Sequence, residues 1–338
     1  MSAKRLAYLA SYHAGLHRLA RAAIRPAGLI YVLHRVVPGP ATDGFDPNHE
    51  LHVTPEVLGG LIDATRAEGL DLVDLDEALA RLAGGARARP FACLTFDDGY
   101  RDNLELALPV CAGRDAPLAV YVTTGFIDRS ADNWWYAIEA LLRAVDSVAL
   151  DGGVLPASTA PEKNAAFAVL AARLRAGDLA ARTAILDGLA ARHGGRFREA
   201  AAALMMDRDG LAALAADRRV TIGAHTVSHP ALARLDEAAA RAEMAASRAI
   251  LQDWLGRPVR HFAYPFGDTP SASAREFRAC AELGFASATT TRFGNLGPGA
   301  LSAPTALPRV PVNGFDDPRT VAVKVSGLAA ALRRLLAG

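Results

Sequence analysis

The chain has 338 residues, enough for one large domain or two smaller ones. Its composition, 51% hydrophobic and 22% charged, is that of a globular protein, and 37 Lys and Arg balance 36 Asp and Glu. This balance excludes the basic excess typical of nucleic-acid-binding proteins, and three scattered cysteines exclude a disulfide framework and a cysteine-based zinc site.

Residues 1–28 are predicted to form an N-terminal amphipathic helix, because Leu6, Leu9, Leu16 and Leu19 recur at roughly helical spacing. Basic residues interrupt the apolar ones, which makes the segment a poor signal peptide, and no run of 18 or more apolar residues predicts a membrane span. We therefore expect a cytoplasmic protein whose first helix packs on the domain. Weak attachment to the inner membrane surface is the alternative.

Short β-rich runs alternate with longer helical stretches between residues 29 and 325. The predicted strands are Leu29–Leu33, Leu70–Val73, Phe91–Phe96, Leu118–Thr123, Val220–Ala224, Phe262–Tyr264 and Ala286–Thr290. The predicted helices are Pro55–Glu68, Leu75–Leu82, Asn103–Cys111, Pro161–Ala176, Leu179–Arg192, Asp209–Ala216, Glu237–Leu255 and Ala274–Leu283. Such alternation is typical of parallel strands joined by helical crossovers. We therefore expect an α/β fold with a distorted barrel of seven or eight strands.

Two further segments accompany this barrel. The interval from about residue 128 to 216 is mostly helical, rich in alanine and broken by two glycine pairs. We interpret it as a helical insertion between two barrel strands rather than an independent domain. Residues 326–338 are expected to form a C-terminal helix.

Adjacent carboxylates, Asp97 and Asp98, end the apolar run that begins at Phe91. In parallel α/β folds the C-terminal ends of the strands carry the chemistry. Side chains of successive strand residues diverge, so one carboxylate can bind a metal while its neighbour faces the substrate water. The alternative is a solvated Asp-Asp-Gly turn.

Two histidines, His225 and His229, follow the strand-like run Val220–Ala224. On a helical turn residues four apart share a face, so both rings can reach one ion, and Pro230 favours a single turn or a loop here. Together the two segments offer three metal ligands and one spare carboxylate. This set is typical of a catalytic metal centre that keeps a position open for water, and it predicts a metal-dependent hydrolase.

Three segments in this order resemble the motifs of the polysaccharide deacetylases, the NodB-homology family of carbohydrate esterases. They are Thr95–Gly99, His225–His229 and Arg260–Gly267, and the similarity spans roughly residues 89–309. The resemblance implies a distorted (β/α) barrel that hydrolyses N-acetyl groups of amino sugars in a polysaccharide, oligosaccharide or glycolipid precursor.

The resemblance also implies roles for individual side chains. Asp97 would be the general base, and Asp98, His225 and His229 would bind the metal. Arg260 would orient Asp97 through a charge-assisted contact. Two imidazoles and one carboxylate suit zinc, and cobalt, nickel, manganese or iron could also serve.

Aromatic and proline residues are candidates for substrate contacts. Tyr264, Pro265 and Phe266 would line the site, and Phe266 would offer a backbone N–H to the reacting carbonyl, since proline has none. Trp134 and Trp135 lie near the start of the insertion and could stack on sugar rings. The alternative is that they anchor the insertion to the barrel.

The chain departs from the family at the general acid. Many members carry this histidine near the C-terminus, but no histidine follows His261 here. His34 ends the first predicted strand, so a closed barrel would bring it to the same rim as Asp97, and imidazole can protonate a leaving amine near neutral pH. Arg309 either points into the cleft, to contact substrate or a catalytic carboxylate, or forms a structural salt bridge.

Other functions remain open at this point. A related enzyme could deformylate or deacetylate a lipid-linked amino sugar, and a catalytically inactive homologue could bind glycans. The alanine-rich insertion could instead serve as an interaction surface. The high Ala, Arg and Gly content is typical of a GC-rich bacterial chain. The sequence does not indicate an oligomeric state.

Overall fold

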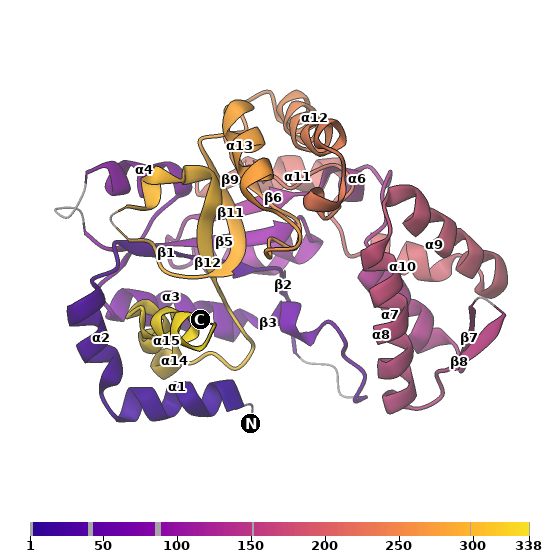
Figure 1. Ribbon diagram of the computed structural model, residues 1–338, viewed down its shortest axis with the longest axis horizontal. Coiled ribbons are helices and arrows are strands. Elements are labelled where there is room, and N and C mark those ends of the chain that lie inside the picture. Colours follow the sequence, from indigo (N-terminus) through magenta and orange to yellow (C-terminus); the bar gives the residue numbers. More distant parts are fainter. Residues whose placement is uncertain (1–2, 40–42, 85–88, 151, 298, 338) are drawn as a thin grey trace.

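The computed structural model describes residues 3–39, 43–84, 89–150, 152–297 and 299–337 (Figure 1). The strands are β1 (Gly28–Leu33), β2 (Arg35–Val36), β3 (His52–Val53), β4 (Asp71–Leu72), β5 (Phe91–Asp98), β6 (Leu118–Val122), β7 (Ser147–Leu150), β8 (Gly153–Pro156), β9 (Val220–Ala224), β10 (His261–Ala263), β11 (Ser287–Phe293) and β12 (Leu307–Pro311). The helices are α1 (Ala3–His13), α2 (Leu16–Ile24), α3 (Pro55–Ala67), α4 (Leu75–Ala83), α5 (Leu108–Ala112), α6 (Thr124–Ile127), α7 (Trp134–Ala144), α8 (Ala160–Ala176), α9 (Leu179–His193), α10 (Arg196–Ala202), α11 (Arg208–Ala215), α12 (Glu237–Leu255), α13 (Ala274–Glu282), α14 (Pro318–Val325) and α15 (Leu328–Ala337).

Parallel strands close into a barrel, which confirms the predicted fold. The strand order is β1-β12-β11-β10-β9-β6-β5, and β5 pairs with β1 to complete the ring within the described part of the chain. Strand β4 pairs only with the first residues of β5 and lies beside the ring. All barrel strands run in the same direction, so their C-terminal ends meet at one rim.

Alternate residues of the barrel strands face inward and outward, as the pleat of a strand requires. In β5 the side chains of Leu94 and Phe96 pack outward against the surrounding helices. Cys93 packs inward with Tyr121 of β6. Gly223 leaves room for this tyrosine, because a Cβ atom at residue 223 would lie 2.4 Å from the Tyr121 ring. The same alternation directs Asp97 inward at the C-terminal rim.

Strand β12 was not among the predicted strands. Pro308 and Pro311 lack a backbone N–H, so the sequence did not favour a central strand there. In the structure β12 lies between β11 and β1, and its pairing with β11 shifts register between Thr289 and Phe293. This unpredicted strand carries Arg309.

The single N-terminal helix predicted for residues 1–28 is wrong. Two helices, α1 and α2, are separated at Gly15, whose φ of 70° is a left-handed conformation that glycine adopts without strain. Helix α1 contacts α14, and α2 contacts both α14 and α15, so the two ends of the chain are neighbours (Figure 1). Helix α15 corresponds to the predicted C-terminal helix. Across the described ranges, no helix has the length and apolar character that a membrane crossing requires.

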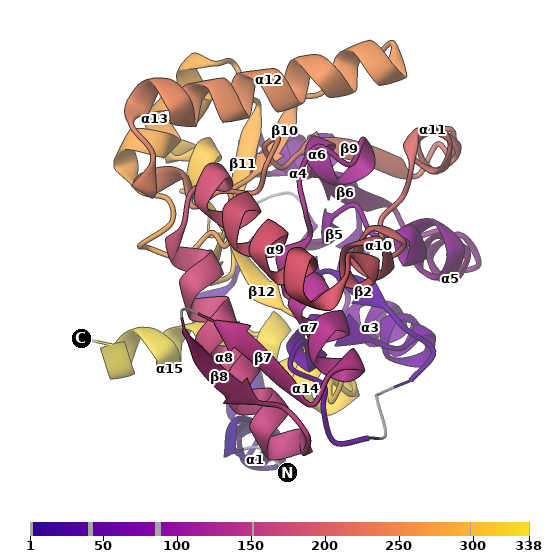
Figure 2. The same cartoon turned by 90° about the vertical axis from the view of Figure 1, so that its right-hand side faces the viewer.

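The chain between β6 and β9 holds α6 to α11 and the antiparallel pair β7–β8, and part of it forms a lobe beside the barrel (Figure 1). This lobe faces the viewer in Figure 2. Helix α8 begins with a capping box, in which Thr159 and Glu162 each accept a backbone N–H of the other residue. The apolar core of this lobe also contains Phe45 and Tyr100, which lie outside the inserted interval. The core of the lobe therefore extends to residues that belong to the loops of the barrel.

Candidate metal centre and adjoining carboxylate

The side chains expected to carry chemistry meet at the C-terminal rim of the barrel. Asp97 and Asp98 end β5, His34 follows β1, and His225 follows β9. The His34 Nε2 atom lies 4.0 Å from Asp97 Oδ2. Parallel strands thus bring together residues that are far apart in the sequence.

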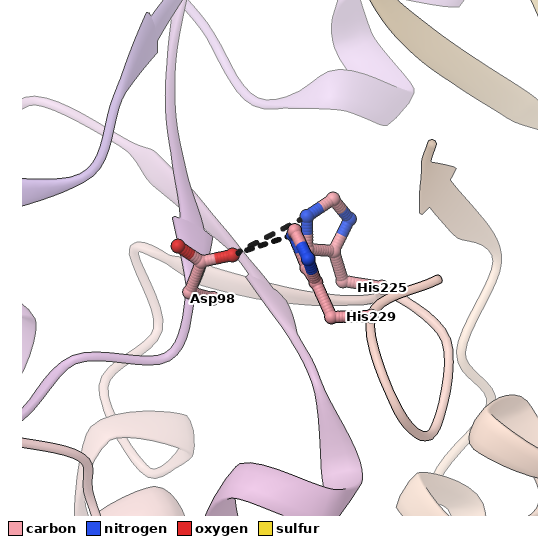
Figure 3. Close-up of side chains that lie close together, drawn as sticks. All are labelled: Asp98, His225 and His229. Atoms are coloured by element: carbon pink, nitrogen blue, oxygen red, sulfur yellow. Dashed lines mark ion pairs between the residues drawn. The ribbon is translucent and has the colours of Figure 1, made fainter. Parts of the chain in front are cut away.

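Asp98, His225 and His229 converge on one point (Figure 3). Asp98 Oδ1 lies 3.4 Å from His225 Nε2 and 3.3 Å from His229 Nε2. All three residues are buried, and their candidate ligand atoms lie within 4.8 Å of one another. The predicted convergence of these residues is therefore observed.

The protonation of this cluster suits a cation. His225 Nδ1 lies 2.7 Å from the Ala263 carbonyl oxygen, which can only accept, so a neutral His225 ring presents the Nε2 lone pair to Asp98. Burial lowers the pKa of His229 to about 4, so this ring is neutral at pH 7. Burial also acts to raise the pKa of Asp98, but His225 and His229 hold that pKa well below its ordinary value.

Asp98 Oδ1 has no hydrogen-bond donor among the described residues. A buried carboxylate oxygen without a donor is costly. A divalent cation between this oxygen and the two facing Nε2 atoms would give Asp98 Oδ1 a partner. Two imidazole nitrogens and one carboxylate oxygen are a donor set that zinc accepts.

Left-handed backbone conformations are concentrated at this site. Asp98, Thr226, His229 and Phe266 have φ between 54° and 76°, which non-glycine residues adopt at a free-energy cost. At Asp98 this conformation interrupts the strand alternation that would otherwise direct its side chain outward. Thr226 Oγ1 accepts the His229 N–H at 3.0 Å and so helps to hold the turn between the two histidines.

Arg309 holds Asp97 in a two-pronged ion pair. Arg309 Nη1 and Nη2 donate to Asp97 Oδ1 and Oδ2 at 2.7 and 2.6 Å, and both residues are buried. Arg309 also donates to the Thr290 carbonyl and to Thr95 Oγ1. Burial acts to raise the pKa of Asp97, but Arg309, helped by His225 and His34, keeps that pKa below its ordinary value. Asp97 is therefore an anionic carboxylate beside the candidate metal ligands.

The expectation that Arg260 orients Asp97 is wrong. Arg260 precedes β10 and lies at the N-terminal end of the barrel, where its Nη1 is 3.2 Å from Asp76 Oδ1 of α4. The rim that carries Asp97 is at the opposite end of the strands. Arg309 makes the expected contact instead, and its complete burial excludes the substrate contact that the sequence had left open.

Tyr264 does not line the site. Its side chain is in the hydrophobic core, its hydroxyl donates to the Thr305 carbonyl at 2.8 Å, and its N–H donates to the Thr289 carbonyl at 3.1 Å. Pro265 is buried and has no N–H. Phe266 does adjoin the site, since its ring centre lies 4.9 Å from that of His229. Its N–H has no acceptor among the described residues.

The two tryptophans do not form a platform for sugars. Trp134 and Trp135 are both buried, and their rings pack edge to face with centres 5.3 Å apart. Trp135 Nε1 donates to the Tyr100 hydroxyl at 3.0 Å, and its ring centre lies 5.0 Å from that of His229. Trp135 instead anchors α7 to Tyr100, which follows β5, and forms a wall of the metal-ligand cluster.

Arg182 and Glu243 hold the histidine loop, and sequence reasoning missed both. Buried Arg182 of α9 donates from Nη1 to the His229 carbonyl at 2.9 Å. Glu243 of α12 accepts the N–H groups of Val227 and Ser228 at 2.8 and 3.0 Å and the Ser228 hydroxyl at 2.6 Å. Each is one charged residue among many on an alanine-rich helix, so no spacing in the sequence singles it out.

Replacing Arg182 with Gln is expected to weaken metal binding by about 10- to 100-fold, because partners that position metal ligands contribute on this scale. The amide cannot reproduce the contacts to His229 and Leu174 together. Competition with a chromogenic chelator would measure the affinity. Arg192→Gln, on an exposed position of the same helix, is the matched control. Equal metal affinities in the two variants would contradict this positioning role.

Comparisons with known proteins agree with this geometry. Residues 159–286 match the family model of the polysaccharide deacetylases. The matched range contains His225 and His229, and the fold brings Asp97 and Asp98 to them from outside it. No curated protein sequence matches the chain significantly.

Solved structures share the fold. The Streptococcus pyogenes deacetylase PplD, solved in complex with acetate, is 16% identical, with 88% of this chain and 97% of that chain covered and a TM-score of 0.55. IcaB from Ammonifex degensii is 19% identical, with the same coverage and a TM-score of 0.56. A de-N-acetylase from Aggregatibacter actinomycetemcomitans is 12% identical, with 88% and 99% covered and a TM-score of 0.58. At these identities the likeness establishes the fold alone.

Proposed function

We propose that the chain is a polysaccharide deacetylase that removes N-acetyl groups from amino sugars in a metal-dependent reaction, because residues 159–286 match the model of that family. The substrate would be a polysaccharide, an oligosaccharide or a glycolipid precursor. One observation carries the proposal: a buried anionic carboxylate, Asp97, lies beside three further side chains that suit a divalent metal.

Asp98, His225 and His229 would hold the metal, and zinc is the first candidate for this donor set, with cobalt, nickel, manganese and iron as alternatives. When bound, the metal would lower the pKa of a water molecule and polarise the acetyl carbonyl. The neutral state of His229 and the hydrogen bond that fixes His225 both support ligation through Nε2.

The protein's own groups would move the protons. Asp97, kept anionic by Arg309, would accept the proton of the attacking water as the new C–O bond forms. The Phe266 N–H would donate to the developing oxyanion, a contribution of about 3 kcal/mol for one such donor. The C–N bond then breaks, acetate leaves, and the amine stays on the sugar after it receives a proton.

His34 is the proposed donor of that proton. Its Nε2 atom lies 4.0 Å from Asp97 Oδ2, at the same rim of the barrel. Burial lowers the pKa of His34, while Asp97 and Asp98 oppose this effect. The ring is thus neutral at pH 7 in the free protein and would gain its proton during the reaction, with Asp97 as a near source.

A screen for acetate release would test the proposed function. Purified protein is incubated with N-acetylglucosamine oligomers, peptidoglycan and lipid-linked amino sugars, with and without a chelator. We expect acetate from at least one class, loss of activity after chelation, and recovery on addition of zinc. Formate release would instead favour a deformylase, and glycan binding without either acid would favour an inactive homologue. Activity that survives complete metal removal would contradict metal dependence.

A further inference from the structure

Helix α2 is amphipathic, but its apolar face points away from the protein. Leu16, Leu19 and Ile24 are spaced to share one face of the helix, and they are 44%, 69% and 43% exposed. Ile24 also packs beside Gly327, but the most buried residue of the helix and its ion pair to the body of the protein are polar. His17 is buried, and Arg21 pairs with Glu68 of the loop after α3. A helix normally buries its apolar face against the core, so this orientation leaves an apolar surface without a partner.

The exposed apolar surface continues onto neighbouring helices. Helix α1 buries none of its residues and exposes Leu6, and α15 exposes Leu332. Of the eight large apolar side chains that are strongly exposed in the described ranges, five lie on α1, α2 and α15. These helices are neighbours at one corner of the molecule (Figure 1). Clustered apolar exposure of this kind marks an interaction site.

The charge of this region identifies the partner. Residues 1–42 contain six Lys and Arg and no Asp or Glu, and residues 318–338 contain four and none. The rest of the chain is therefore acidic, although the whole is nearly neutral. Arg18 of α2 and Arg25, which directly follows the helix, are exposed beside the apolar residues. Acidic residues just outside these ranges pair with some of the cations, as Glu68 does with Arg21 and Asp317 with Arg5, but α2 itself carries no acidic residue. Apolar side chains flanked by cations on one helix fit the boundary between acyl chains and anionic headgroups.

A cavity of about 490 Å³ adjoins the same helix. Its lining includes Ile24 of α2, Arg25 directly after this helix, Arg81 of α4, and Leu29 and Phe91 at the N-terminal end of the barrel. No acidic residue is among the lining residues in the described part of the chain. The cavity therefore extends the surface inward with the same combination of apolar walls and arginines, which suits a molecule with an apolar chain and an anionic head.

We propose that α1 and α2 form a docking surface for an anionic phospholipid bilayer, with the apolar face of α2 inserted among the lipids. This inference does not depend on the proposed catalytic function, because α2 and the cavity beside it adjoin the N-terminal end of the barrel, and the metal-ligand cluster lies at the C-terminal rim. A bilayer explains the inverted helix, the exposed leucines and the one-sided charge together. A second copy of the chain could cover the exposed leucines, but it would place its own cations against the cations of the first copy.

Co-sedimentation with lipid vesicles tests the proposal. The full chain is mixed with vesicles of pure phosphatidylcholine or of phosphatidylcholine with phosphatidylglycerol. We expect clear binding only with phosphatidylglycerol, weakened as salt screens the charges, and a loss of about tenfold or more in Leu19→Glu and Ile24→Glu. Val169→Glu changes a residue that is 47% exposed on α8 and should bind like the parent.

Three results would overturn the proposal: equal binding to both vesicle types, undiminished binding by Leu19→Glu, or an equal loss in Val169→Glu. Light scattering can give a fourth result that would overturn it. If the parent chain is a dimer that Leu19→Glu separates, and the parent does not bind vesicles, the surface is an interface between copies. Thermal unfolding confirms that the variants are folded, and because Leu19 is so exposed we expect an unchanged midpoint. Acetate release from a soluble oligomer reports separately on the catalytic proposal.

Discussion

Asp97→Asn is expected to lower kcat for acetate release by about a thousandfold while the protein keeps its metal. An amide has no lone pair basic enough to accept the proton of the attacking water, and general bases contribute roughly 10²- to 10⁴-fold. The three metal ligands are unchanged, and the amide introduced by this substitution can still accept one hydrogen bond from Arg309. Steady-state kinetics and metal analysis by mass spectrometry on the same sample would measure both quantities.

The control is the neighbouring carboxylate. Asp98→Asn removes a metal ligand, so we expect the bound metal itself to be lost. His34→Ala distinguishes the role of the general acid from that of the general base. It should retain metal and lose rate mainly at the step that protonates the amine. A normal kcat in Asp97→Asn would remove Asp97 as the base, and a parental rate in His34→Ala would remove His34 as the acid. Each variant must be assayed below its own unfolding temperature, since Arg309 loses its counter-charge in Asp97→Asn.

Much of the fold was predictable because parallel barrel strands are apolar on both faces and alternate with helices. All seven predicted strands are present, with ends that differ by a few residues. Strand β12 escaped prediction because Pro308 and Pro311 contradict the ordinary chemistry of a central strand. It is recognised only when β11 and β1 are seen to leave a gap between them.

The convergence of Asp97, Asp98, His225 and His229 was predictable for the same reason, since each follows or ends a parallel strand. The identity of the arginine was not. Arg260 and Arg309 both adjoin strands in the sequence, but one precedes β10 and the other lies within β12. Which end of the barrel each occupies depends on where those short strands begin.

Burial in the inserted lobe also could not be derived from the sequence. Trp134 and Trp135 begin a helix whose surroundings come from α8, α9 and α10, and only their packing decides that the rings are covered. A sequence of tryptophans next to polar residues is equally typical of an exposed sugar-binding surface. Arg182 raises the same difficulty, because its carbonyl partner belongs to a loop 47 residues away.

Arg309→Met is expected to lower the free energy of unfolding by about 3–5 kcal/mol at pH 7, the usual penalty for removing one partner of a buried ion pair. Methionine fills much of the volume but leaves Asp97 as a buried charge without its cation. In the parent, the pKa of Asp97 is below its ordinary value of ~3.9, so its contribution to stability is present above that pH and is lost as the pH falls through the folded-state pKa.

In the variant, burial becomes the dominant influence and the pKa of Asp97 rises, so acid should relieve the penalty by neutralising the carboxylate. The gap in unfolding free energy between parent and variant should therefore shrink from pH 7 to pH 5 in urea titrations. The acidic limb of the kcat/KM profile should move to higher pH for the same reason. Arg309→Lys keeps the charge but loses the paired geometry. Its unfolding free energy should therefore lie between those of the parent and of Arg309→Met.

The double variant Asp97→Asn with Arg309→Met provides the decisive comparison, because neither buried charge remains. Its unfolding free energy should exceed that of Arg309→Met alone, since the uncompensated carboxylate is gone. A pH-independent penalty in Arg309→Met, unchanged in the double variant, would mean that Arg309 stabilises the barrel by packing. Asp97 would then need another source for the low pKa that its role as a base requires.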